Sequence, residues 1–125
     1  MRVIDFRKKI LKAIENDEYE DCIKLFKSLE DRRDLTPEEL VQKSRCIQLS
    51  EGSASLEEAE QALRRAIDLD EDYLPALLDL GWFYHAVMDD SRRALSYFQR
   101  AAEISREALR EAQKGERECK DELAS

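Results

Sequence analysis

The stretch LLDLGWFYHAVMDDSRRALSYFQRA, residues 77–101, decides the fold of this chain. It predicts two amphipathic helices separated by the short break DDS, because apolar residues recur at helical spacing on both sides of that break. The first of these helices has no clear polar face, and it contains the only tryptophan and the only histidine, Trp82 and His85. We therefore expect this helix to contact other parts of the structure on two faces, one of which faces the core of the domain.

The composition of the whole chain indicates one all-α domain. Of the 125 residues, 40% are charged and 42% are hydrophobic, whereas only 3 are glycine and 2 are proline. This balance is typical of surface-charged helices rather than of strands and turns. The length suits one hydrophobic core and leaves no room for a second folded domain.

The net charge argues against nucleic acid or a membrane as partner. The chain has 21 lysines and arginines against 29 aspartates and glutamates, so its formal charge of −8 opposes binding to phosphate backbones and anionic lipids. The N-terminal segment is interrupted by charges and lacks the apolar run of a secretory signal. Cys22, Cys46 and Cys119 lack metal-ligand spacing, and the first two lie at apolar-face positions of predicted helices. We expect reduced, buried thiols and a cytoplasmic location.

Helix signals recur along the chain with short links between them. Thr36 is predicted as an N-cap, with Pro37 at the first helical position and Glu39 completing a capping box, and Ser55 with Glu58 repeats the box pattern. A break is expected at 50–55. The apolar spacing predicts six helices, at about 3–14, 23–29, 37–49, 56–69, 74–88 and 92–115.

The predicted helices repeat in pairs. The first helices of the three pairs share apolar or small residues at positions i, i+4 and i+7. The second helices share a small residue at i, a large one at i+4 and a small or apolar one at i+7. The first set is Phe6, Ile10 and Ala13; Leu40, Ser44 and Ile47; and Leu77, Gly81 and Tyr84, and the second set is Cys22, Phe26 and Leu29; Ala59, Leu63 and Ala66; and Ala94, Phe98 and Ala101.

This pattern resembles the tetratricopeptide repeat family. The third unit carries the resemblance best, because Leu77-x2-Leu80-Gly81-x2-Tyr84 followed by Ala94-x3-Phe98-x2-Ala101 is similar to the signature of that family. The sequence departs from the family by a few extra residues between helices and by Asp34 and Glu71, where proline is frequent. The resemblance implies antiparallel helix pairs stacked as a short right-handed α-solenoid, whose concave face is lined by the first helix of each pair.

The expected domain covers residues 1–114, with repeats at about 3–36, 37–73 and 74–106 followed by a helical extension, and 115–125 is expected to be a charged tail. Small residues at Gly81 and Ala94 are expected to let paired helices approach closely. The extension is expected to cap the last repeat, to lie in the groove of its own or a neighbouring chain, or to pair with a second chain.

The resemblance further implies that a protein or peptide binds in the concave groove. The candidate partner-binding residues lie one stripe beyond the core face, and they are Arg7, Leu11, Ile14, Val41, Arg45, Gln48, Leu78, Trp82 and His85. The family's clamp for a peptide carboxylate is not expected, because Val41, Gln42, Leu78 and Asp79 stand where lysine, asparagine and arginine would be needed. For Trp82 two interpretations stay open: burial against the chain's own long C-terminal helix, or contact with a partner.

Catalytic and metal-binding patterns are missing from the sequence. There is one histidine and no glycine-rich phosphate loop, and DLDED at 68–72 lacks the glycine and the final glutamate of a calcium loop. We therefore expect no enzyme, no cofactor and no metal site.

Three functions remain open at this point. The first is a non-enzymatic interaction module that binds a peptide segment or a partner protein through the groove. The second is a small acidic inhibitor that neutralises a basic toxin or nuclease through acidic stretches such as 57–72. The third is a homodimeric scaffold formed through the C-terminal helix.

Overall fold

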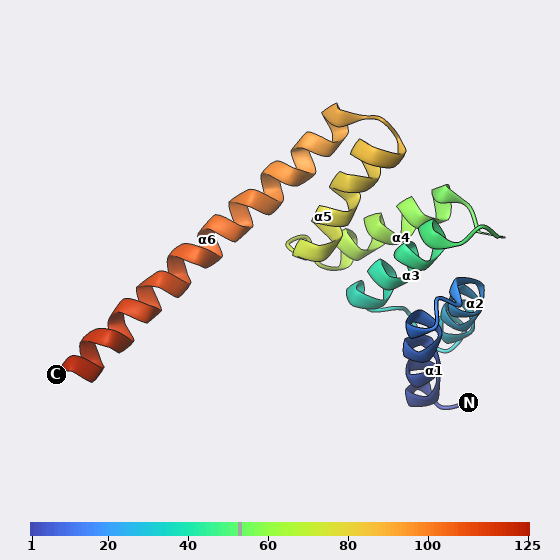
Figure 1. Cartoon of the computed structure of the whole chain (residues 1–125), viewed down its shortest axis with the longest axis horizontal. Helices are drawn as coiled ribbons and strands as arrows, with labels where there is room; N and C mark the ends of the chain where they lie inside the picture. The colour runs from blue at the N-terminus through green and yellow to red at the C-terminus, as the bar shows by residue number, and fades with distance from the viewer. Residues whose placement is uncertain (53) are drawn as a thin grey trace.

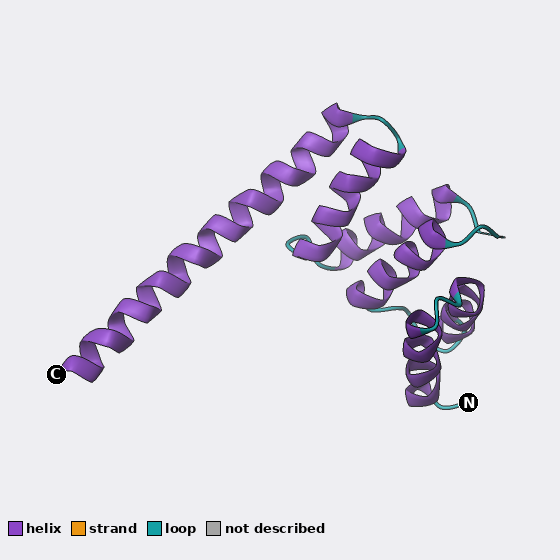
Figure 2. Ribbon diagram, viewed as in Figure 1, coloured by secondary structure: helices purple, strands orange, loops and turns teal. Residues whose placement is uncertain are grey.

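The computed structural model describes residues 1–52 and 54–125, in which it contains helices and no strand (Figure 2). The elements are α1 (Val3–Glu15), α2 (Tyr19–Glu30), α3 (Pro37–Leu49), α4 (Leu56–Leu69), α5 (Leu74–Trp82), the π-helical turn η1 (Phe83–Val87) and α6 (Ser91–Ala124). The all-α prediction is therefore confirmed. Ser53, within the break predicted at 50–55, lies outside the described residues.

Each helix packs against the helix that follows it in the sequence, from α1 on α2 through to α5 on α6, and α3 also contacts α5 (Figure 1). The core lies between these helices. Every repeat position named from the sequence is buried except Phe98, which is half-buried. The helical spacing thus predicted the core-facing side of each helix correctly.

Small residues bring neighbouring helices close together. The hydroxyl of Ser44 on α3 is fully buried and donates a hydrogen bond to the backbone carbonyl of Ala59 on α4 over 2.9 Å. Gly81 on α5 faces the ring of Phe98 on α6 so closely that an added Cβ would lie 2.8 Å from Cε1 of that ring. A larger side chain at either position would hold the two helices apart.

The buried hydroxyl of Tyr84 links the second and third helix pairs. It donates a hydrogen bond to Oε1 of Glu60 on α4 over 2.6 Å and accepts one from Nη2 of Arg64 over 2.6 Å. The guanidinium carbon of Arg93 on α6 lies 4.3 Å from the centre of the tyrosine ring. A polar group inside the core is thereby satisfied rather than left unpaired.

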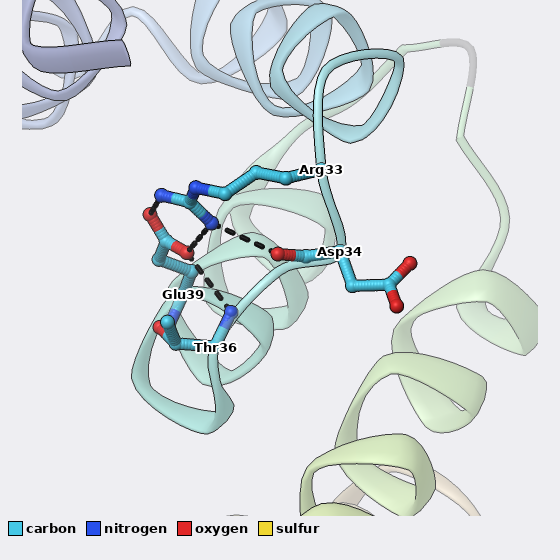
Figure 3. A network of polar contacts seen from close by, with 4 residues as sticks. All are labelled: Arg33, Asp34, Thr36 and Glu39. Carbon is cyan, nitrogen blue, oxygen red and sulfur yellow. Dashed lines mark hydrogen bonds and ion pairs between the residues drawn. The ribbon is translucent and has the colours of Figure 1, made fainter.

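The connection between α2 and α3 is held by one polar network (Figure 3). Arg33 donates two hydrogen bonds to the buried carboxylate of Glu39, over 2.7 and 3.0 Å, and a third to the carbonyl oxygen of Asp34 over 2.9 Å. The backbone amides of Thr36 and Glu39 complete the predicted capping box, over 2.9 and 3.2 Å. Burial alone would raise the pKa of Glu39, but the hydrogen bonds from Arg33 and Thr36 hold it below its usual value.

Helix α6 is longer than expected from the sequence. It spans 34 residues and continues through Gly115 to Ala124, which corresponds to about 51 Å at 1.5 Å per residue. The glycine costs only about 1 kcal/mol in a helix, and good helix formers and the Glu116–Lys120 ion pair, at 2.9 Å, follow it. After Ala101 only Ile104 and Gly115 are half-buried and all other residues are exposed. The C-terminal part of α6 projects away from the other helices (Figure 1).

Candidate functional site

An open groove of about 340 Å³ lies between α3 and the continuous segment α5–η1, and we call it the α3–α5 groove. Its lining residues are Arg45, Gln48, Leu49, Asp79, Trp82, Phe83, Ala86 and Val87. Three large apolar side chains in it are well exposed: Leu49 by 59%, Trp82 by 57% and Val87 by 41%. Apolar side chains that gather in one exposed hollow are typical of an interaction site, whereas scattered ones need no explanation.

A pair of charged residues spans the groove. Nε and Nη2 of Arg45 on α3 donate hydrogen bonds to the two carboxylate oxygens of Asp79 on α5, over 2.7 and 3.0 Å. The hydrogen bond to Asp79 raises the pKa of Arg45. This two-point contact fixes the separation of the two helices at the groove and neutralises both charges there. The surface offered to a partner is therefore mainly apolar, with a polar wall.

The π-helical turn η1 shapes the second wall. The amide of Met88 donates to the carbonyl of Phe83 over 3.1 Å, five residues back, and the amide of Asp90 donates to the carbonyl of Tyr84 over 2.7 Å. Asp89 has a positive φ of 51°, which ends the helix before α6. Ala86 and Val87 of this turn line the groove. Single π-helical turns within helices occur frequently at functional sites.

Trp82 is the largest exposed side chain of the groove. Its ring stands edge-on to the ring of Phe98 on α6, with 5.0 Å between centroids, and lies 5.8 Å from the ring of His85. Contact with α6 is thus made through its first turns, and the projecting part of α6 leaves the indole 57% exposed. Of the two interpretations of Trp82, burial beneath the chain's own C-terminal helix is wrong.

Three of the nine predicted groove residues lie in this groove. These are Arg45, Gln48 and Trp82. Arg7 and Leu11 line a separate depression of about 140 Å³, where α1 faces the start of α3. The candidate stripe is therefore divided between two hollows.

The other four predicted residues lie outside both hollows. Leu78 and His85 are exposed but do not line either one, and Nδ1 of His85 is hydrogen-bonded to the hydroxyl of Ser91 at 3.2 Å. Ile14 is half-buried and packs against the core. Val41 is only 3% exposed, so its prediction as a partner contact is wrong. Its position is buried because α3 packs against three other helices, α2, α4 and α5.

Five residues of the groove were not predicted as partner contacts: Leu49, Asp79, Phe83, Ala86 and Val87. Leu49 and Ala86 lie four residues after Arg45 and Trp82, so extending the same helical stripe by one turn would have found both. Val87 lies outside the predicted stripe, although it follows Phe83 by four residues and Asp79 by eight, which is the helical spacing of the groove residues on the α5–η1 segment.

The part of the chain that the structure describes contains no cluster of three or more histidine, cysteine, aspartate or glutamate side chains placed to hold a metal ion. None of its described helices is both long and apolar enough to cross a membrane. Comparison with known proteins gives no match, whether to a family model, to a curated protein or to a solved structure.

Proposed function

We propose that this chain is a non-enzymatic interaction module that binds a segment of another protein in the α3–α5 groove. The observation that carries the proposal is the exposure of Leu49, Trp82 and Val87 in one hollow. A soluble domain gains nothing for its own stability from such a cluster, whereas a partner that covers it removes apolar surface from water.

We further propose that the helices form a short right-handed solenoid of the tetratricopeptide type. The repeated buried positions and the packing of each helix on the next support it. In such a solenoid α1, α3 and α5 line the concave face. The two hollows with predicted residues border these helices, which supports this arrangement.

The chemistry of the groove indicates the type of segment it accepts. An aliphatic or aromatic side chain of the partner fits between Leu49 and Trp82, because both expose apolar surface there. The amide of Gln48, held by a hydrogen bond of 3.2 Å to Ser44, stands at the polar wall beside Arg45. Tryptophan and arginine are also the residues that most often dominate binding energy at protein interfaces.

A capture experiment with two groove variants tests the proposal. Binders are selected from a peptide library with the unchanged protein, and their affinities are then measured for Trp82→Ala and Arg45→Glu. We expect both variants to lose at least tenfold in affinity, which corresponds to about 1.4 kcal/mol. Leu109→Ala is the matched control, because Leu109 is exposed by the same 57% but lies on the projecting part of α6. Selected binders that tolerate both groove variants would contradict the proposal.

A second candidate function is a homodimeric scaffold formed through α6. It is favoured by the projecting part of α6, whose apolar stripe of mainly small residues continues the face that packs on α5. The exposed members of this stripe include Ala108, Ala112 and Cys119. Sedimentation of the full chain and of a chain ending at Ser105 tests it: a dimer that becomes a monomer on truncation supports the scaffold, and monomers in both cases exclude it.

A further inference from the structure

Two buried cysteines face each other across the contact between α2 and α3. The side chain of Cys22 is fully buried and that of Cys46 is 3% exposed. Their Sγ atoms lie 2.9 Å apart although the residues are 24 positions apart in the sequence. Neither cysteine lines the α3–α5 groove. The remaining cysteine, Cys119, is exposed on the projecting part of α6.

The separation of the two sulfur atoms is close to that of a covalent bond. A disulfide bond is about 2.05 Å long, so the sulfurs need to approach by only about 0.9 Å. We propose that Cys22 and Cys46 form a covalent modification site, in which a small peroxide such as hydrogen peroxide converts the two thiols into a reversible disulfide that links α2 to α3.

The reaction balances without a further reactant. The thiolate of one cysteine attacks a peroxide oxygen, the O–O bond breaks, and a sulfenic acid and one water form. The second sulfur then attacks the sulfenic sulfur, the S–O bond breaks, and a second water leaves. Two thiols lose two electrons and two protons, and one peroxide is reduced to two waters.

The contact between the two sulfurs allows either one to start the reaction. Either thiol can donate in the contact of 2.9 Å, so whichever sulfur attacks the peroxide has the other already beside it to close the disulfide. Because this second sulfur is already in contact, closure competes well with further oxidation of the sulfenic acid.

Burial determines the rate and the consequence of the reaction. A small oxidant reaches either sulfur only when α2 and α3 open locally, so the pair reacts more slowly than the exposed Cys119. The disulfide closes a loop between two elements that already touch, which removes freedom mainly from the unfolded chain. For a loop of this length we expect the ratio of folded to unfolded protein to rise by roughly a hundredfold.

The test uses the full chain with Cys119→Ser, which changes an exposed residue and leaves the buried pair intact. After hydrogen peroxide treatment of the native protein, we expect an intact mass lower by two hydrogens and a digest in which the peptides of Cys22 and Cys46 are linked. Dithiothreitol should restore the original mass. The urea midpoint of the oxidised protein should exceed that of the reduced protein.

Cys22→Ala with Cys119→Ser is the matched control, since it retains Cys46 alone. It should gain oxygen atoms at Cys46 or form an intermolecular dimer, and it should show no loss of two hydrogens. The proposal is overturned if the native protein with both buried cysteines keeps two free thiols, if its sulfurs only gain oxygen, or if the link forms solely after unfolding in guanidinium chloride. The groove plays no part in these readouts, so they are independent of partner binding.

Discussion

Substitution of Gly81 by alanine tests whether α5 and α6 pack as closely as the structure shows. The added Cβ would lie 2.8, 2.9 and 3.0 Å from Cε1, Cζ and Cδ1 of Phe98. The ring has limited room to move away, because Trp82 stands edge-on to it at 5.0 Å. One of the two helices, or the aromatic pair, must shift to admit a single methyl group.

Two opposing effects set the magnitude. Alanine in place of glycine gains about 1 kcal/mol of helix propensity. Overpacking of a closely packed contact costs about 1–3 kcal/mol. The overpacking dominates here because three ring atoms are approached at once, so we expect Gly81→Ala to lower the free energy of unfolding by about 1 kcal/mol. That corresponds to roughly 4 °C in melting temperature for a domain of this size.

Urea denaturation followed by circular dichroism measures the effect. Gly115→Ala serves as the matched control, because apart from its chain neighbours and the nearby backbone of its own helix no atom lies within 4 Å of a Cβ added there. It should raise helix content without loss of stability. In a Phe98→Leu background the cost of Gly81→Ala should largely vanish, because the ring that it meets is absent. A Gly81→Ala protein at least as stable as the unchanged chain would refute the close contact.

Three further predictions concern the capping network, the projecting helix and the groove. Glu39→Gln should lower the free energy of unfolding by about 2 kcal/mol at neutral pH, because it weakens buried, charge-assisted hydrogen bonds with Arg33. The pKa of Glu39 is lowered on folding. The contribution of its carboxylate to stability is therefore present above the ordinary glutamate pKa and is lost as the pH falls through the lower folded-state value. The difference in urea midpoint between the unchanged protein and Glu39→Gln should therefore shrink below about pH 4. A chain ending at Ser105 should lose helical signal yet keep the urea midpoint of the full chain, because almost all residues removed are exposed; a lower midpoint would show that the projecting helix stabilises the core. Trp82→Ala should change the free energy of unfolding by no more than about 1 kcal/mol, as measured by circular dichroism, because its ring contacts the domain mainly through one edge-on aromatic pair; a much larger loss would assign Trp82 to the core rather than to partner binding.

Local signals in the sequence were sufficient to place most of the helices. The start of α3 was predicted to the residue, because its signals lie within a single turn. Thr36 and Glu39 form a capping box, and Pro37 at the first helical position has no amide hydrogen that needs a partner. Helical spacing also predicted the buried repeat positions, because apolar residues three and four apart lie on one face of a helix. The end of α6 was not predicted, since one glycine costs too little to stop a helix of good helix formers.

The composition of the α3–α5 groove could not be predicted from spacing along single helices. Arg45 and Trp82 were predicted as candidate partner contacts, but their meeting in one hollow with Asp79 depends on how α3 and α5 lie against each other. Val41 was predicted at the surface because its own helix offers a free stripe there, and only the packing of α3 against three other helices buries it. Val87 lies outside the predicted stripe, and its place in the groove depends on the same placement of helices.

For this protein, the sequence by itself determined the helical class, most helix boundaries and the core positions, because caps and apolar spacing act within one or two turns of the chain. The tertiary structure alone decided which exposed side chains share a hollow, and that Cys22 and Cys46 touch across 24 residues. These features depend on the relative placement of helices. That placement is set by contacts between positions far apart in the chain, which spacing along one helix does not encode.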